Sequence, residues 1–254
     1  MPRLDEIINV IENVVPLSDA AEWDNSGLLY GDCGKKIKKV LITLDLTPAV
    51  AEEALESNVD LIIEHHPSLF SPVKKFTPYM IEETSFLRVA GRDIAVYASH
   101  TASDFALKGL NYYFAKKLGL KDVERKRDGD EVVFIGKTAK TSLKSLKEKV
   151  ADVFGDELAY FVGDGEKVVE TVGVVTGGGG SVDAAVYARD NGADVYISGD
   201  VKYHCARWTK DSGYAIINLN HYASEIIFID YMAEILKNCD VEIIKSRHCV
   251  NPYN

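Results

Sequence analysis

The stretch Leu61-Ile-Ile-Glu-His-His-Pro-Ser-Leu-Phe70 is the part of the sequence from which the fold and the site can be worked out. An apolar run at its start predicts a buried strand over residues 59–65. The strand ends in two adjacent histidines, and Pro67 keeps His66 out of the α region, so the chain stays extended before it turns. Ligand sites in open α/β sheets form at the carboxyl ends of strands, and this stretch therefore indicates a functional site.

Most other histidines lie in three later segments. The chain has six histidines, and five of them lie either in the opening stretch or in the segments 100–104, 199–204 and 220–225. Scattered core or surface histidines would rarely group in this way. The pattern predicts a divided metal site, assembled from distant parts of the chain.

His65 and His66 are the first candidate ligands. Successive side chains of a straight strand point to opposite faces, so two adjacent histidines would not share one ion. The pair fits one histidine per ion in a two-ion site, or one ligand beside a supporting group. Two ordinary histidines at a strand end are the alternative.

His100 follows a predicted strand over 94–98 in the same way, and Asp104 lies four residues further on. A carboxylate supplies the hard oxygen that divalent metals favour beside imidazole. Asp104 by itself also fits an N-cap for a helix predicted over 106–118. Its shared strand-end location with the histidine pair favours the metal interpretation.

His221 and Glu225 stand four residues apart at the start of an apolar helix predicted over 221–237. This spacing places both side chains on one helix face, where they could bind an ion together. An N-terminal ion pair is the alternative, because an anion is also favoured near the positive end of the helix dipole. Asn220 is the expected N-cap.

Two further features precede helices. The glycines 177–180 do not match a phosphate-binding motif and are better explained as a tight strand-to-helix turn. Asp200 fits a helix cap, and His204 fits a supporting or substrate-facing group. His100 and His204 are the candidates for catalytic proton transfer, because imidazole titrates near neutral pH. His248 lies outside the clusters and is expected on the surface.

The remaining sequence alternates predicted strands with helices of 10–15 residues, which is typical of parallel, helix-covered sheets. Two α/β lobes are expected. The charged run 121–130 is the best candidate for a boundary, which divides the chain into 1–125 and 126–254. The second lobe would then contribute the helix 221–237, packed back to complete the metal site.

Composition narrows the class of protein. The 254 residues are 46% hydrophobic and 27% charged, which is ordinary for a globular protein. A net charge of −10 disfavours a dedicated nucleic-acid binder or a membrane-surface protein. No apolar stretch approaches the ~20 residues of a membrane span. The N-terminus lacks a signal-peptide core, and the four separated cysteines suggest no disulfide framework, so a cytoplasmic location is expected.

Several segments together resemble a known family. They are Asp24-Asn-Ser-Gly-Leu-Leu-Tyr-Gly31, Leu44-Asp45, His65–Phe70, His100–Asp104, Gly109-Leu-Asn111, Ser198-Gly-Asp200 and His221–Glu225. In this order they resemble the NGG-one-interacting-factor-three-like family, whose members are commonly labelled GTP cyclohydrolase I type 2 homologues. The resemblance runs from about residue 20 to residue 226.

This resemblance implies two interlinked α/β lobes with largely parallel or mixed sheets, a dinuclear metal centre and toroidal homohexamers. The ligands carried over by motif are His65, His66, Asp104, His221 and Glu225, the same set that the chemistry selects. Three positions near them depart from the usual family pattern: Ala102 replaces an asparagine, Tyr203 replaces the first of two histidines, and Asn220 replaces a glycine.

Two functions are therefore expected to compete. The first is a metal-dependent hydrolase of a nucleotide-like small molecule, with two divalent ions (iron, zinc, manganese or nickel) that activate water. The second is a non-catalytic metal-binding ring that engages nucleic acid or a regulatory protein. The basic residues 125–127 would provide its contacts, although the acidic total counts against this.

Overall fold

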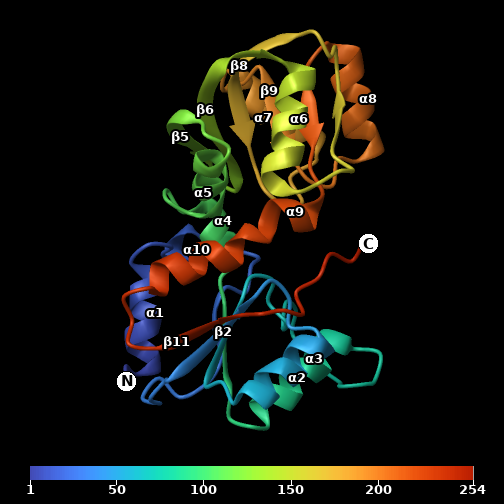
Figure 1. Ribbon diagram of the computed structural model, residues 1–254. Helices are drawn as coiled ribbons and strands as arrows, with labels where there is room; N and C mark the ends of the chain where they lie inside the picture. Colours follow the sequence, from blue (N-terminus) through green and yellow to red (C-terminus); the bar gives the residue numbers. More distant parts are fainter. Residues whose placement is uncertain (254) are drawn as a thin grey trace. The chain divides into compact units, whose positions relative to one another are not determined.

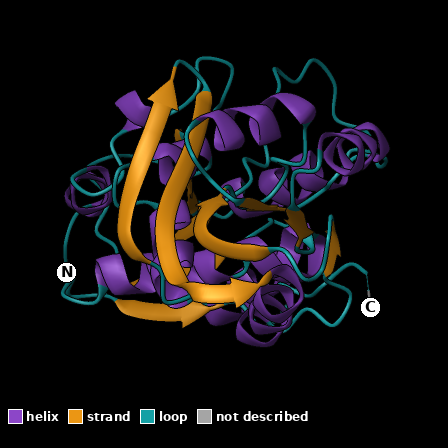
Figure 2. Cartoon of the chain, turned by 90° about the horizontal axis from the view of Figure 1, so that it is seen from above, coloured by secondary structure: helices purple, strands orange, loops and turns teal. Residues whose placement is uncertain are grey.

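The computed structural model describes residues 1–253 and divides the chain into two compact units. The first unit comprises Met1–Gly109 together with the chain from Phe228 onward, and the second comprises Leu110–Ile227. Each unit has its own β-sheet with helices packed on it, as the ribbon in Figure 1 and the cartoon in Figure 2 show. The expected α/β fold with mixed sheets is confirmed.

The sheet of the first unit has five strands in the order β1-β4-β3-β2-β11. Four of them are parallel neighbours, and β1 pairs antiparallel with β4 at one edge. Their bounds are β1 Gly27–Tyr30, β2 Lys39–Thr43, β3 Leu61–Glu64, β4 Ala95–Ala98 and β11 Glu242–Lys245. The strand that precedes His65 is therefore central and completely buried. Its parallel neighbours β2 and β4 end at the same edge of the sheet.

Helices cover both faces of this sheet. Leu41, Ile62 and Val96 pack against α2 (Pro48–Ser57) and α3 (Ile81–Ala90) on one face. Helix α2 begins as the sequence predicts, because Thr47 accepts a hydrogen bond from the Val50 amide and proline occupies the first helical position. On the other face, the hydroxyl of Tyr97 donates to Glu12, the last residue of α1 (Leu4–Glu12).

The sheet of the second unit has six strands in the order β5-β6-β8-β9-β10-β7. Strands β8, β9 and β10 are parallel neighbours, while β5, β6 and β7 pair antiparallel. Their bounds are β5 Lys121–Asp128, β6 Glu131–Ser142, β7 Tyr160–Val162, β8 Val168–Val174, β9 Val195–Ser198 and β10 Ile216–Asn218.

Four longer helices belong to the two faces of this second sheet. Val133 and Tyr196 share a core with Ala185 of α7 (Val182–Asp190) and Cys205 of α8 (Tyr203–Ser212). Phe114 of α5 (Leu110–Lys117) stacks on Phe154 of α6 (Leu143–Phe154), with ring centroids 3.9 Å apart. These contacts give the second unit a hydrophobic core of its own.

Three elements differ from the expectations. The charged run 121–130 forms β5 and its turn inside the second unit, so the units separate at Gly109 and Phe228 instead of at 125. The predicted helix over 106–118 is replaced by α4 (Thr101–Phe105) and α5. The predicted helix 221–237 is two helices, α9 (His221–Glu225) in the second unit and α10 (Ile227–Leu236), most of which lies in the first.

The described residues contain no helix that is both long and apolar enough to cross a bilayer. All four cysteines lie within the described part of the chain, and none of them forms a disulfide.

Candidate metal centre

A bend after β3 brings His65 and His66 to the same side of the chain. The strand ends at Glu64, and the backbone amides of both histidines donate to one carbonyl, that of Leu44, at 3.1 and 3.0 Å. This arrangement interrupts the alternation of a straight strand. The centroids of the two imidazole rings lie 4.9 Å apart, so the argument from a straight strand does not apply to this pair.

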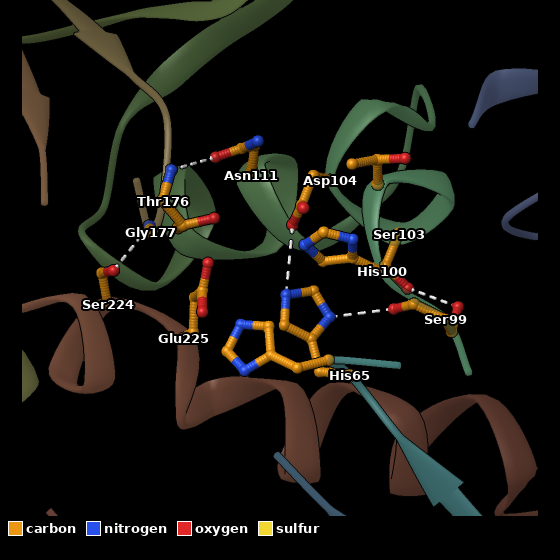
Figure 3. A network of polar contacts seen from close by, with 12 residues as sticks. His65, Ser99, His100, Ser103, Asp104, Asn111, Thr176, Gly177, Ser224 and Glu225 are labelled. Carbon is orange, nitrogen blue, oxygen red and sulfur yellow. Dashed lines mark hydrogen bonds and ion pairs between the residues drawn. The ribbon is translucent and has the colours of Figure 1, made fainter. Parts of the chain in front are cut away.

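His65 is held in one tautomer. Its side chain is fully buried, and its Nδ1 lies 2.9 Å from the carbonyl oxygen of Ser99, which can only accept (Figure 3). The Nδ1–H therefore donates, and Nε2 carries the lone pair that a metal ion would need. This Nε2 lies 3.7 Å from Oδ1 of Asp104, a distance longer than a direct hydrogen bond.

Asp104 is not the N-cap of a following helix. It lies within α4 and is 9% exposed, with its carboxylate directed at His65 in Figure 3. Beside it, the hydroxyls of Ser99 and Ser103 are hydrogen bonded at 2.7 Å and tie the end of β4 to α4. Of its two sequence interpretations, the structure supports the oxygen donor beside a histidine.

His66 and His100 are each oriented by an aspartate. Nδ1 of His66 donates to Asp45 at 2.7 Å, and Nδ1 of His100 donates to Asp24 at 2.7 Å. Metal-binding histidines commonly donate their second ring nitrogen to a carboxylate or a carbonyl in this way, because the bond fixes the tautomer and raises the basicity of the ring.

Asp24 remains an anion although its side chain is fully buried. Burial by itself raises the pKa of a carboxyl, but hydrogen bonds from His100, Ser26 and Thr101 outweigh that effect and hold the pKa of Asp24 well below its usual range. Both the backbone amide and the hydroxyl of Thr101 donate to it. Asp24 thus anchors the start of α4 as well as His100.

The three histidines of the first unit form one group. A ring nitrogen from each of His65, His66 and His100 lies within 4.8 Å of the others. Two imidazole nitrogens on opposite sides of one ion would be about 4.2 Å apart at a metal–nitrogen distance of about 2.1 Å. The limit of 4.8 Å exceeds this span by about 0.6 Å, so the three rings could hold a divalent ion after a small shift, with Asp104 as a neighbouring oxygen donor.

Glu64, directly before the pair, is a buried acid. Burial raises the pKa of its carboxyl to about 8, although the hydrogen bonds from Ser68 lower it in part. Its Oε1 accepts from the Ser68 amide at 2.7 Å and from the Ser68 hydroxyl at 2.9 Å. Glu64 is therefore protonated at neutral pH, and it fastens the loop that follows the histidines.

The second unit contributes a separate donor pair on α9. Nε2 of His221 lies 2.9 Å from Oε2 of Glu225, and Nδ1 donates to Asp200 at 2.8 Å. Burial lowers the pKa of His221, but the two carboxylates outweigh it and raise that pKa to about 9. In the metal-free protein this histidine is charged. The spacing of four residues places both groups on one face, as the sequence predicts.

The glycines 177–180 make room for this pair. Gly177 has a φ of +65°, and a Cβ on it would lie 1.8 Å from Oε1 of Glu225 and 3.2 Å from Nε2 of His221. Its amide donates to the Ser224 hydroxyl at 2.8 Å. The tight strand-to-helix turn is thus observed, and its chemical consequence is close backbone approach to the Glu225 carboxylate (Figure 3).

The remaining candidates lie elsewhere. His204 is exposed in the first turn of α8 and contacts the ring of Tyr203, outside the histidine–carboxylate groups found in the described residues. His248 is exposed, as expected. Asn220 occupies the N-cap position of α9, but its side chain makes no capping hydrogen bond. Its backbone amide donates to the Asp156 carboxylate at 2.6 Å.

Sequence reasoning missed the orienting roles of Asp24, Asp45 and Asp200. Asp200 does not cap α8, whose N-cap is Lys202; it adopts a φ of +50° and binds His221. Asp45 and Asp200 each follow the end of a strand, by two residues, which is the one signal that could have marked them. Asp24 carries no such signal, because it reaches His100 from 76 residues away.

Comparison with known proteins connects this geometry to a family. The family model described as Duf34/NIF3 (NGG1p interacting factor 3) matches residues 2–252. A Streptococcus pneumoniae protein named GTP cyclohydrolase 1 type 2 homolog is 32% identical, with 98% of each chain covered. A Drosophila melanogaster protein named NIF3-like protein 1 is 30% identical and covers 92% of this chain and 82% of its own.

Solved structures agree with the fold. A hypothetical protein of Staphylococcus aureus has a TM-score of 0.90 at 22% identity, covering 99% of this chain and 98% of its own. Reduced HcgD from Methanocaldococcus jannaschii has a TM-score of 0.83 at 29% identity, covering 96% and 97%. The match over nearly the whole length shows that the chain belongs to the Duf34/NIF3 (NGG1p interacting factor 3) family.

Proposed function

We propose that the protein is a metal-dependent hydrolase that acts on a nucleotide-like small molecule. The observation that carries this proposal is the orientation of the three histidines of the first unit. Each donates Nδ1–H to a fixed acceptor, namely Ser99, Asp45 or Asp24, and keeps Nε2 as the basic ring nitrogen, which would bind a metal in His65 and His66 and take up a proton in His100. Packing alone would not require three rings with the same tautomer.

We infer that two divalent ions are bound, with His65, His66, Asp104, His221 and Glu225 as the ligands. Mixed imidazole and carboxylate donors suit iron, zinc, manganese or nickel. Each unit supplies part of this set with an orienting partner already in place: Ser99 for His65, Asp45 for His66 and Asp200 for His221. Bound ions of this kind lower the pKa of a coordinated water and polarise the group that is attacked.

His100 is suited to move a proton beside such a centre. Its Nδ1–H is held by the Asp24 carboxylate, so its Nε2 can accept a proton and later return it. The permanent charge of Asp24 stabilises the imidazolium that forms. His204, exposed on α8, is given no role in this scheme. The Streptococcus pneumoniae relative is named a GTP cyclohydrolase 1 type 2 homolog, which supports a nucleotide-like substrate.

The test is metal analysis of purified protein followed by an activity screen with each metal. About two ions per chain are expected, as in two-metal hydrolytic sites. The double variant H65A/E225A should lose both ions, while the control H248A/E234A, which removes an exposed histidine and an exposed glutamate, should keep them. Stoichiometric metal in H65A/E225A would refute the ligand set. Metal binding without turnover, together with salt-dependent binding of single strands, would support the non-catalytic alternative.

We further propose that the protein forms a closed homohexamer in the cytoplasm. Closed symmetric homo-oligomers dominate soluble assemblies, and the unbridged cysteines suit a reducing compartment. Light scattering at several concentrations measures the assembly directly. A monomer whose mass does not change with concentration would contradict it.

A further inference from the structure

A pocket lined by aromatic side chains borders the histidine group within the first unit. It has a volume of about 510 Å³, and its walls include Trp23, Asp24, Asn25, Leu69, Phe70 and Phe76. Ligand sites for small molecules usually have about 300–1,000 Å³. We call this feature the aromatic pocket.

Its aromatic surface is open to solvent. Trp23, Phe70 and Phe76 are 57%, 49% and 47% exposed, although rings of this size are normally among the more buried side chains. The rings of Trp23 and Phe70 are 6.1 Å apart and tilted by 56°, so they do not cover each other face to face. A flat ring bound against their exposed faces would remove apolar area from water and would add favourable aromatic contacts.

The pocket and the histidine group share structural elements. Trp23 and Phe70 each approach the ring of His100, at centroid distances of 6.1 and 6.2 Å. Asp24 lines the pocket, while its fully buried side chain binds His100. The wall that contains Leu69 and Phe70 follows His65 and His66 in the chain. The side-chain amide of Asn25 connects the two walls by donating to the Leu69 carbonyl at 2.6 Å.

We propose that the aromatic pocket binds the planar heteroaromatic ring of the substrate, next to the group on which the histidine centre acts. The inference rests on the proposed function and names the part of the site that selects the substrate. A concave pocket with a polar margin and three aromatic side chains suits a small ring better than a protein, since specific protein interfaces bury about 800 Å² per partner. Stacking on aromatic side chains tolerates several ring types, because every base has a π-face.

The test uses the fluorescence of Trp23. The chain has two tryptophans, and the other, Trp208, lies in α8 of the second unit beneath Arg189. In metal-free W208F protein, guanosine 5′-monophosphate should quench the remaining tryptophan in a saturable way, and ribose 5-phosphate, which lacks the ring, should not. F70A in the same background should weaken the apparent Kd by about fivefold to about 150-fold, given about 1–3 kcal/mol per stacked base.

Y79A is the matched control. Tyr79 belongs to the same long loop, is 93% exposed and does not line the pocket, so its removal should leave the Kd unchanged. Absence of quenching, or equal affinity in F70A, would overturn the inference even if the metal-loaded protein hydrolyses nucleotides. A drop in oligomer mass in F70A with no response to nucleotide would instead show an interface between copies. Saturable quenching that F70A weakens, without hydrolysis under any metal, would leave the ring pocket standing and refute only the hydrolase.

Discussion

Replacing Gly177 with alanine should lower the free energy of unfolding and weaken metal binding at the same time. An L-residue in the left-handed region costs about 1–2 kcal/mol, and the φ of Gly177 is +65°. The new Cβ would also lie 1.8 Å from Oε1 of Glu225, so the carboxylate or the loop must move. Overpacking of this kind costs about 1–3 kcal/mol more. The expected loss is about 2–5 kcal/mol.

Gly213 provides the control for backbone strain. Its φ is +70°, and a Cβ on it would meet nothing within 4 Å. Gly213→Ala should therefore show the strain term alone, about 1–2 kcal/mol, with wild-type metal content. Urea unfolding gives the free energies, and titration with a divalent ion such as zinc or manganese gives the affinities.

The difference between the two variants isolates the contact with Glu225. A G177A protein that unfolds with the same free energy as G213A and binds metal with wild-type affinity would refute the reasoning. It would mean that Glu225 can move away without cost, and that its observed position is not needed to bind an ion.

Three other predictions follow from the charged groups near the site, each measured in metal-free protein. The pKa of His221 is raised to about 9, so its contribution to folding stability is present below pH 6.5 and is lost as the pH rises toward 9. Asp200→Asn should lower this pKa in an NMR titration, and an unchanged pKa would contradict the role of Asp200 in raising it. Asp24→Asn should cost about 2 kcal/mol in urea unfolding at pH 7 and should free the His100 ring from its charged partner. The difference from wild type should shrink as the pH falls below about 4, because the lowered pKa of Asp24 contributes its full stability above the unfolded pKa and loses it progressively toward the folded pKa. Glu64→Gln should leave the free energy of unfolding nearly unchanged at pH 4. It should also abolish the loss of stability that wild type shows between pH 4.5 and about 8, because a raised carboxyl pKa makes the folded state the better proton acceptor. A pH profile identical to that of wild type would count against a protonated Glu64.

Much of the fold could be predicted because its signals are local. Helix α2 begins where its cap and proline place it, and the alternation of apolar strands with helices predicted two helix-covered sheets, although not β5, whose charged residues were assigned to a boundary. The break between α9 and α10 could not be predicted, because residues 221–237 are continuously compatible with one helix. Strand β11 joins the sheet of the first unit by pairing with β2, and local sequence does not reveal such pairing between distant segments.

The sequence by itself determined the residue types of the candidate site and the local pairings. The spacing of His221 and Glu225 places them on one helix turn whatever surrounds them. Only the tertiary structure decided how the histidines are oriented. The shared Leu44 carbonyl turns His65 and His66 to one side, and Asp24 reaches His100 across 76 residues. Local spacing constrains atoms within a few residues of each other, whereas these bonds form only after parallel strands have brought their ends to one edge of a sheet.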